Sequence, residues 1–440
     1  MSSTEQLDRK VAEAQHDWKA PSVVAVLVRD GEVTWSCSVG SADLGALPAG
    51  LDVAYRIGSI TKTFTAVLIH QLRDEGLVDL DASLADHLPG TRHSTMTLRR
   101  LLAHASGLQR EVGDMWVSFT EPSREDLLAE LERSTQVLPA HLAHHYSNLA
   151  YAVLGEVVAR VTDSTWEAQL QTRLLDPLRM TRTSLAPSTP HAQGYFTHPF
   201  ADAVVPEVHT ATGAAAPAMQ LWSTPSDLAR WAAFLADPPT ALLAEQTLEQ
   251  MRQPVIMFDP STFALAWGGG LMLRRQGDRV LHGHGGAMPG FLAGCYSFRD
   301  ERERAGAIVL TNTGRTADAE GLACDLLVTA LDADPRPAPP WVPAGVPGEL
   351  RDLLGPWWAE GTEVLFEYRD GDLSAIVRGG VERRRTRFRR TGSDTWVAFS
   401  GRERGETLTV LRIPTGAVHR LQFAGYSYTR EPLSFAELKP

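Results

Sequence analysis

The stretch Gly58-Ser59-Ile60-Thr61-Lys62-Thr63-Phe64-Thr65-Ala66-Val67-Leu68-Ile69-His70-Gln71-Leu72 decides the fold of this 440-residue chain. Its apolar residues recur at helical spacing and predict a mostly buried helix, which Gly76 is expected to stop. Ser59 and Lys62 are three residues apart, so one helix face brings their side chains together. A serine at a helix N-terminus, with an amine one turn on, is the arrangement of an activated nucleophile.

Lysine is scarce in this chain, which makes Lys62 unusual. Four of the 42 Lys and Arg residues are lysines, and the other three lie near the chain ends. Arginine keeps its proton in proteins, whereas a buried lysine can lose it. Alternatively, Ser59 only caps a helix and Lys62 is an ordinary surface residue, a reading that spacing alone leaves open.

Composition bounds the class of protein. Hydrophobic residues make up 43% and charged residues 22%, which is typical of a soluble globular protein, and the length predicts one large domain plus an appendage. The net charge of -11 argues against nucleic-acid and anionic-membrane partners. The N-terminus is polar and no apolar run could span a bilayer, so we expect no membrane segment and a cytoplasmic location.

Several site types lack their motifs. Cys37, Cys295 and Cys324 are far apart, which predicts neither a disulfide framework nor a zinc site. His141, His144 and His145 have ligand-like spacing, but there is no HExxH and no fixed acidic partner, so no metal site is expected. A G-x-S-x-G elbow and the glycine fingerprints of nucleotide sites are also absent from the sequence, and we expect no cofactor.

The order of expected elements predicts an α+β fold. A helix over 4–18 and a hairpin over 23–39, turning at Asp30-Gly31, open the chain. A mostly helical middle over 77–185 includes a helix that starts at Met96 and ends at Gly107. Strands over 271–274, 280–282, 292–298 and 305–312 and a helix over 318–331 follow. One antiparallel sheet is therefore expected to take strands from both ends around the helical middle.

A proline-rich stretch divides the chain. We expect a first domain over 1–333, a linker over 334–344 and a β domain over 345–440. Six short strands separated by turns, between 363 and 423, predict a small antiparallel barrel or sandwich. The basic cluster at 383–390 is expected to be a solvated face of this domain rather than an anion site.

Two further stretches carry polar groups. Tyr146-Ser147-Asn148 precedes an apolar helix starting at Leu149, and Asn148 alone reads most simply as its N-cap. His284-Gly285-Gly286-Ala287 lies at a strand edge, where glycine permits close approach of a ligand and a backbone N–H can hold an oxyanion. A glycine-rich turn is the simpler interpretation of this stretch in isolation.

The three stretches together resemble the motifs of the penicillin-recognising serine hydrolases. Ser59-Ile60-Thr61-Lys62, Tyr146-Ser147-Asn148 and His284-Gly285-Gly286 stand in the family's order, and Leu101 to Leu108 resembles another of its recurring segments. The branch that looks most similar includes class C β-lactamases, D-alanyl-D-alanine carboxypeptidases, D-aminopeptidases and related esterases. The resemblance covers about residues 5–332 and implies a β-lactamase/transpeptidase-like fold. The tail resembles a lipocalin-like β domain.

The resemblance also implies roles. Ser59 would be acylated, Lys62 would assist proton removal, and Tyr146 would act as general base and then as acid toward the leaving group. Asn148 would contact Lys62 and the acyl-side amide of the substrate. The backbone N–H groups of Ser59 and Ala287 would form the oxyanion hole, beside Gly285 and Gly286.

His284 stands where many relatives carry lysine. A lysine there grips a substrate carboxylate, whereas histidine is largely neutral near pH 7. The sequence therefore favours an esterase or a D-peptidase or amidase, acting on small ester, peptide or amide substrates, over an efficient β-lactamase. A true β-lactamase and a catalytically silent binding or regulatory protein are the alternatives, and self-association is left open.

Overall fold

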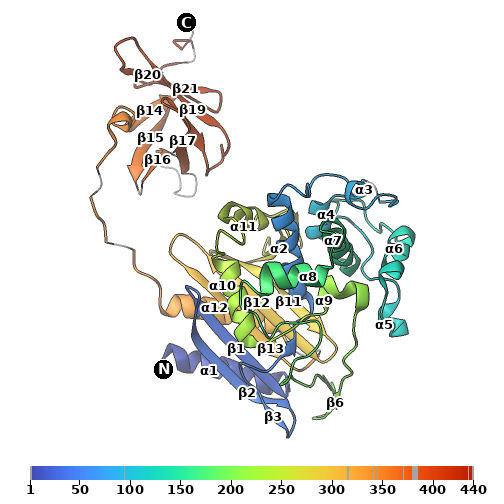
Figure 1. Ribbon diagram of the computed structural model, residues 1–440. Helices are drawn as coiled ribbons and strands as arrows, with labels where there is room; N and C mark the ends of the chain where they lie inside the picture. The colour runs from blue at the N-terminus through green and yellow to red at the C-terminus, as the bar shows by residue number, and fades with distance from the viewer. Residues whose placement is uncertain are drawn as a thin grey trace. The chain divides into compact units, whose positions relative to one another are not determined.

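A computed structural model describes residues 2–93, 95–314, 317–338, 340–343, 345–369, 371–378, 385–434 and 436–438. The chain forms two compact units, residues 1–338 and residues 339–440 (Figure 1). Among the described residues, no helix has the length and apolar character needed to cross a membrane.

A nine-stranded antiparallel sheet forms the centre of the first unit. The prediction that one sheet takes strands from both ends is confirmed, and β1 lies beside β13, with Val23 opposite Thr311. Across the sheet the order is β3-β2-β1-β13-β12-β11-β10-β9-β8. The strands are β1 Ser22–Arg29, β2 Glu32–Asp43, β3 Leu47–Pro48, β8 Ile256–Met257, β9 Leu265–Trp267, β10 Met272–Gln276, β11 Arg279–Met288, β12 Phe291–Arg299 and β13 Arg304–Thr311.

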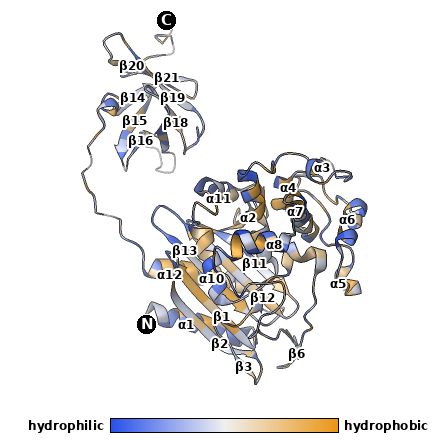
Figure 2. Ribbon diagram, viewed as in Figure 1, coloured by the Kyte–Doolittle hydropathy of each residue, from blue (hydrophilic) through white to orange (hydrophobic). Residues whose placement is uncertain are grey.

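Helices cover both faces of this sheet. Successive side chains of a strand point to opposite faces, so β1 contributes Val24, Val26 and Val28 to one core and its alternate residues to the other. The first core contains α2 (Thr61–Asp74) and α10 (Pro225–Ala236), and the second contains α1 (Ser3–Asp17) and α12 (Ala319–Ala333). Figure 2 shows the apolar central strands between these layers.

The helical middle is built from short segments. These are α3 Leu84–His87, α4 Leu98–Leu102, α5 Met115–Ser118, α6 Arg124–Arg133, α7 Asn148–Val161, α8 Trp166–Leu170, α9 Ala216–Met219 and α11 Glu245–Met251. Two small strand pairs accompany the helices: β4 Tyr55–Arg56 pairs with β7 Trp222–Ser223, and β5 Tyr195–Thr197 pairs with β6 Val204–Pro206. The helix predicted to run to Gly107 ends at Leu102, so its predicted length was wrong. His104 has a φ of 53°, which takes the chain out of the helix.

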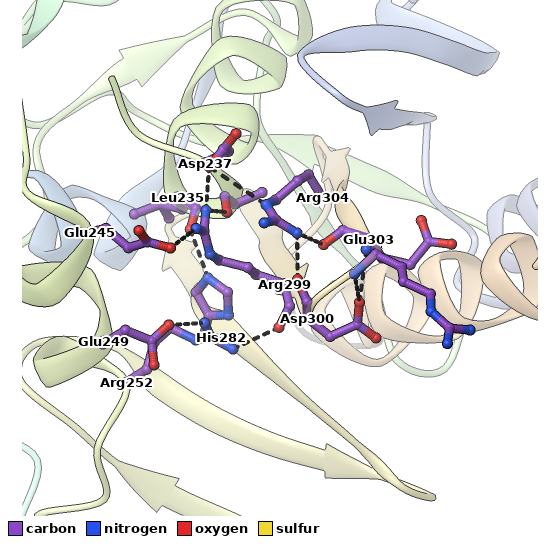
Figure 3. Close-up of polar contacts among 12 residues, drawn as sticks. Leu235, Asp237, Glu245, Glu249, Arg252, His282, Arg299, Asp300, Glu303 and Arg304 are labelled. Carbon is purple, nitrogen blue, oxygen red and sulfur yellow. Dashed lines mark hydrogen bonds and ion pairs between the residues drawn. The ribbon is translucent and has the colours of Figure 1, made fainter. Parts of the chain in front are cut away.

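A charged cluster joins helices to one end of the sheet (Figure 3). Arg299 of β12 donates to the carbonyl of Ala236 at 3.1 Å and pairs with Asp237 and Glu245. The ring of His282 on β11 donates from Nε2 to Leu235 O at 2.8 Å. These bonds satisfy carbonyls at the C-terminus of α10 and fix this helix to the sheet.

The second unit is a nearly closed barrel of eight antiparallel strands, as the predicted fold class requires. Its strands, in chain and sheet order, are β14 Gly355–Ala359, β15 Thr362–Arg369, β16 Asp372–Val377, β17 Thr386–Arg390, β18 Thr395–Ala398, β19 Thr407–Arg412, β20 Val418–Phe423 and β21 Tyr426–Tyr428. Trp358 and Thr429 exchange backbone hydrogen bonds of 2.8 and 3.0 Å and bring the two ends together. The sequence missed β14 and β21. The predicted strand at 383–390 is seen from Thr386, while 383–384 lie outside the described residues.

The start of the predicted linker is held on the first unit. Arg29 donates to the carboxylate of Asp334 at 2.8 Å, and Arg336 pairs with Asp30. Arg336 also donates to the carbonyl of Arg302 at 3.1 Å. Asp334 and Arg336, just after α12, are therefore fixed by ion pairs and hydrogen bonds.

Candidate active site

Ser59 lies in a tight turn that two glycines bring against β11. It occupies a 3-10 turn, Gly58–Ile60, that leads directly into α2. Gly58 has a φ of 49°, and a Cβ on it would lie 2.6 Å from the Ala287 nitrogen. A Cβ on Gly286 would lie 1.9 Å from the carbonyl oxygen of Ile57. Only glycine allows this approach, which puts the backbones of Ser59 and Ala287 side by side.

The Ala287 N–H faces an open strand edge. Met288 and Phe291 close the two-residue turn between β11 and β12, so they form a hydrogen-bonded pair. Pairs alternate, so Ala287 and Leu292 form a non-hydrogen-bonded pair, and the Ala287 N–H points away from β12. On that side β10 ends its pairing at Gly283. His284-Gly285-Gly286 is therefore part of β11, not the turn that the sequence offered as an alternative.

Lys62 is fully buried beneath Ser59. Its Nζ lies 3.0 Å from Ser59 Oγ, 2.7 Å from Asn148 Oδ1 and 2.8 Å from the carbonyl oxygen of Ala218. Burial, the largest cause, moves the pKa of Lys62 well below 10.5, and the nearby Glu111 partly offsets this. The reading of Lys62 as an ordinary surface residue is therefore wrong.

The three partners of Lys62 Nζ are all oxygens, and the carbonyl oxygens of Asn148 and Ala218 can only accept. When the amine is neutral, it has two N–H bonds and one lone pair, and these two carbonyls take its two hydrogens. Its lone pair then faces Ser59 Oγ, where it can receive the hydroxyl proton.

Asn148 is free for this contact because it is not the helix cap. Ser147 is the N-cap of α7, and its Oγ accepts from the Ala150 N–H. Asn148 is the first helical residue, so its simplest interpretation, as an N-cap, was wrong. Its Nδ2 donates to both carboxylate oxygens of Glu111, which turns Oδ1 toward Lys62.

Tyr146 lies over the same centre. Its ring centroid is 4.7 Å from Lys62 Nζ, and a hydrogen bond with the Ser59 side chain partly offsets the effect of burial on its pKa. Burial is the largest cause and raises the pKa of Tyr146 above its usual 10. The phenol therefore holds its proton in the resting site.

His104 packs against the ring of Tyr146 and helps to hold it in place. Sequence reasoning did not assign this role. Its ring stacks on Tyr146 with centroids 4.2 Å apart, and its Nδ1 accepts from the Ser147 N–H at 3.0 Å. It belongs to the segment Leu101 to Leu108, whose family resemblance was the available signal. Glu111 was named by no motif, and its role depends on a loop contact that sequence spacing does not predict.

His284 is buried and neutral. Its Nδ1 lies 2.5 Å from the carbonyl oxygen of Gly285, which can only accept, so Nδ1 carries the proton. Nε2 is then an acceptor, and it has no partner among the described residues. Burial, assisted by the nearby Lys62, lowers the pKa of His284 to about 3. This histidine cannot provide the positive charge of a lysine at neutral pH.

These groups line one cavity of about 880 Å³. Ser59, Tyr146, Asn148, His284 and Ala287 all contribute to its wall. Its charged lining residues, within the part of the chain that the structure describes, are one arginine and four carboxylates: Arg110, Glu111, Glu207, Asp318 and Glu320. The same part contains no group of three or more His, Cys, Asp or Glu residues placed to hold a metal ion. The cavity therefore has an acidic wall.

Comparison with known proteins places this chain in a family. A family model described as Beta-lactamase matches residues 7–328, and one described as a domain of unknown function (DUF7586) matches residues 346–430. Beta-lactamase-like protein 2 of Dictyostelium discoideum is 29% identical over 271 residues, which are 58% of this chain and 49% of that protein. Protein flp of Staphylococcus aureus (strain N315) is 24% identical over 335 residues, 70% of this chain and 63% of that protein. The chain thus spans less than two thirds of these relatives.

Solved structures agree with this match. The D-amino acid amidase from Ochrobactrum anthropi SV3, complexed with L-phenylalanine amide, is 27% identical with a TM-score of 0.64, covering 75% of this chain and 97% of that one. SurE is 24% identical, with a TM-score of 0.62 and coverage of 98% and 99%. The octameric penicillin-binding protein homologue from Pyrococcus abyssi is 21% identical, with a TM-score of 0.66 and coverage of 97% and 99%, and the last two show the fold alone. The chain belongs to the beta-lactamase family of penicillin-recognising serine hydrolases.

Proposed function

We propose that this chain hydrolyses ester or amide bonds through an acyl-enzyme on Ser59. The observation that carries the proposal is the position of Lys62 Nζ, 3.0 Å from Ser59 Oγ and fully buried. A hydroxyl is a poor nucleophile until a base takes its proton, and a neutral amine at this distance is such a base. No cofactor is needed for this chemistry.

Acylation uses each group once. Ser59 Oγ attacks the carbonyl carbon while its proton passes to Lys62 Nζ. The oxyanion accepts hydrogen bonds from the N–H groups of Ser59 and Ala287. As the bond to the leaving group breaks, Tyr146 gives its proton to the departing nitrogen or oxygen, and the proton on Lys62 restores the phenol. The raised pKa of Tyr146 favours this acid role over the base role that the family resemblance implies.

Deacylation repeats the sequence with water. Water attacks the acyl carbonyl from the side that the leaving group vacated, where the phenolic oxygen lies. Its proton is taken up through the Tyr146 and Lys62 pair, and Ser59 Oγ recovers a proton as the acid product leaves. The two N–H groups hold the second oxyanion as they hold the first.

The preferred substrate is an amide or ester of a small amino acid with a free α-ammonium. The Glu111 carboxylate lines the cavity beside Asn148, and the acidic wall favours a cation. The D-amino acid amidase neighbour supports a D-configured acyl group. The neutral His284 supports neither a β-lactamase nor a carboxypeptidase, since both act on substrates with a free carboxylate.

A substrate panel with one variant tests the proposal. Wild type should hydrolyse D-phenylalanine amide or a chromogenic D-alanyl ester, and Ser59→Ala should lose this activity while keeping its melting temperature. A fluorophosphonate should add one covalent mass to the wild type and none to Ser59→Ala. Ser118→Ala removes an exposed hydroxyl and serves as the matched control. Retained activity or labelling in Ser59→Ala would refute the assignment, and an unlabelled, inactive wild type would favour a silent binding protein.

Self-association is a separate proposal. One structural neighbour is described as octameric, and this chain aligns with it over 97% of its length. We propose that this chain also forms homo-oligomers. Light scattering on the full chain across a concentration series tests this, and a monomer mass throughout would contradict it.

A further inference from the structure

We propose that Glu320 selects the leaving group of the substrate, favouring one that carries a positive charge and rejecting one that carries a free carboxylate. This inference rests on the proposed function, because it names the substrate class of the same site. It follows from how Glu320 is placed over β11.

Glu320 occupies a notch that two glycines make in the sheet. Gly285 of β11 and Gly294 of β12 lie directly opposite each other. A Cβ on Gly285 would lie 2.0 Å from the carboxyl carbon of Glu320, and a Cβ on Gly294 would lie 2.9 Å from its Cα. Because neither glycine has a side chain, the first turn of α12 packs directly against the two strands. The carboxyl group of Glu320 therefore lines the cavity.

One oxygen of this carboxyl group remains available. Tyr296 donates its hydroxyl to Glu320 Oε2 at 2.6 Å, which fixes the side chain. Among the described residues, Tyr296 is the one hydrogen-bond donor to this carboxyl group, and Oε1 accepts no hydrogen bond and forms no ion pair. Burial, the largest cause, raises the pKa of Glu320 above its usual value, and the hydrogen bond from Tyr296 and the nearby Arg274 partly offset this. In its ionised form, the carboxylate can accept one further hydrogen bond from a substrate at Oε1.

A second acceptor lines the same cavity, on the other face of β11. His284 is 3% exposed and presents its unpartnered Nε2 lone pair. Consecutive strand residues point to opposite faces, so the His284 ring lies on the face away from Glu320, which occupies the side-chain position of Gly285. On the α12 face of the cavity, a cationic group can therefore pair with the Glu320 carboxylate, whereas a carboxylate meets like charge.

The leaving group is the part of the substrate that reaches this position. The acyl side is placed at Asn148 and Glu111, in the helical region on the α2 side of the sheet. Glu320 comes from α12 on the opposite face. Its charge is one of the causes that raise the pKa of Tyr146, the residue that protonates the leaving group. The two carboxylates therefore act on different halves of the substrate.

Three matched amides test the assignment. D-Alanine is joined to ethylenediamine, to propylamine and to glycine, which give cationic, neutral and anionic leaving groups of similar size. In the wild type, kcat/KM should be at least about tenfold higher for the cationic than for the anionic amide. In a partly buried site, the interaction energies of attracting and repelling unit charges a few ångströms apart differ by more than this factor requires. Glu320→Gln keeps the shape and should reduce the ratio to within about threefold of unity.

Two further variants separate charge from structure. Tyr296→Phe removes the hydrogen bond but keeps the carboxylate, so the discrimination should persist. Asp325→Asn removes one negative charge from the same helix outside the cavity, where it pairs with Lys10, and should leave the ratio unchanged. High salt should lower the wild-type ratio and leave that of Glu320→Gln unaffected. An unchanged ratio in Glu320→Gln would overturn the assignment.

The labelling rate of Ser59 tests the role of Glu320 separately from the proposed function. Phosphonate esters with the same three leaving-group charges react with the serine whether or not the amides are turned over. If no amide is hydrolysed, the proposed amidase activity fails, while the ratio of labelling rates still decides the role of Glu320. Equal labelling by the cationic and anionic probes would refute the selection of the leaving group.

Discussion

The side-chain amide of Asn148 and the carboxylate of Glu111 form a bidentate pair, with Nδ2 to oxygen distances of 3.0 and 2.9 Å. A carboxylate can only accept, so this pair fixes which end of the amide is Oδ1. That oxygen then accepts from Lys62 Nζ at 2.7 Å. Glu111 therefore orients the proposed base through Asn148, and its carboxylate, which lines the cavity, also pairs with Arg110 at 3.1 Å.

Glu111→Gln should weaken the preference for substrates with a free α-ammonium. The amide keeps a hydrogen bond to Asn148 but cannot neutralise an ammonium. We expect kcat/KM for D-alanyl p-nitroanilide to fall about tenfold, because the Glu111 side chain is 26% exposed and already pairs with Arg110. The N-acetylated anilide, which has no charge, should be affected much less. The ratio of the two rates is the measurement.

The matched control for this charge is Glu125→Gln, because Glu125 is exposed on α6. It should leave the ratio of the two anilides as in the wild type. If Glu111→Gln slows both anilides equally, Glu111 acts only by orienting Asn148, and the recognition of an ammonium is refuted.

Lys62→Arg should inactivate the protein although it conserves a cationic side chain. A guanidinium does not give up its proton, so it cannot receive one from Ser59. The expected loss in kcat is about 10²- to 10⁴-fold, the contribution usual for a general base. Lys10→Arg is the matched control, since Lys10 lies on the surface in an ion pair with Asp325. Wild-type rates in Lys62→Arg would remove the proton-transfer role.

Gly286→Ala should damage both stability and activity. Its Cβ would lie 1.9 Å from the carbonyl oxygen of Ile57, so β11 must move away from the Ser59 turn. Overpacking of this kind costs about 1–3 kcal/mol. The same movement separates the two N–H groups and should lower kcat about 10²- to 10³-fold, the usual cost of losing one oxyanion donor. Gly50→Ala, whose nearest neighbour would be 4.0 Å away, is the control for both melting temperature and rate. A fully active Gly286→Ala would contradict the proposed oxyanion hole.

Local patterns predicted the elements that carry the main residues of the site. The helical spacing after Ser59, the Asp30-Gly31 hairpin and the apolar strands near the end of the first unit all depend on neighbours in the sequence. These strands and the helical stretch between them predicted one sheet with strands from both ends, and the structure adds that β1 pairs with β13. The family resemblance of the three motifs then predicted that they meet in one site, which their spacing alone could not predict.

The parts that sequence reasoning missed depend on distant contacts. The lone-pair direction of Lys62 requires Ala218 and Asn148, which are 156 and 86 residues away. The proposed role of Glu111 depends on the position of a loop, and that of Glu320 depends on the space left by two glycines. Sequence periodicity predicts neither. In the second unit, β14 and β21 were missed; they pair with β15 and β20, and Trp358 and Thr429 bring these two strands together across the chain.

The stability of the first unit should fall steeply below neutral pH, and His282 is one cause. Its ring is fully buried against the α10 carboxyl end (Figure 3), and burial lowers its pKa from 6.5 to about 3. Between these two values the unfolded chain binds a proton that the folded chain does not. The neutral ring therefore contributes stability that is fully present above pH 6.5 and is lost as the pH falls toward 3.

His282→Gln should flatten this dependence. Glutamine can donate to Leu235 O and does not titrate, so the slope of the unfolding free energy between pH 6 and 4 should decrease by about 1.4 kcal/mol per pH unit. Urea unfolding of the first unit at half-unit pH intervals measures this slope. His16→Gln, an exposed change on α1, should leave the slope as in the wild type. A slope in His282→Gln equal to that of the wild type would mean that this ring is already charged in the folded state at pH 4, against its burial and its contact with Leu235.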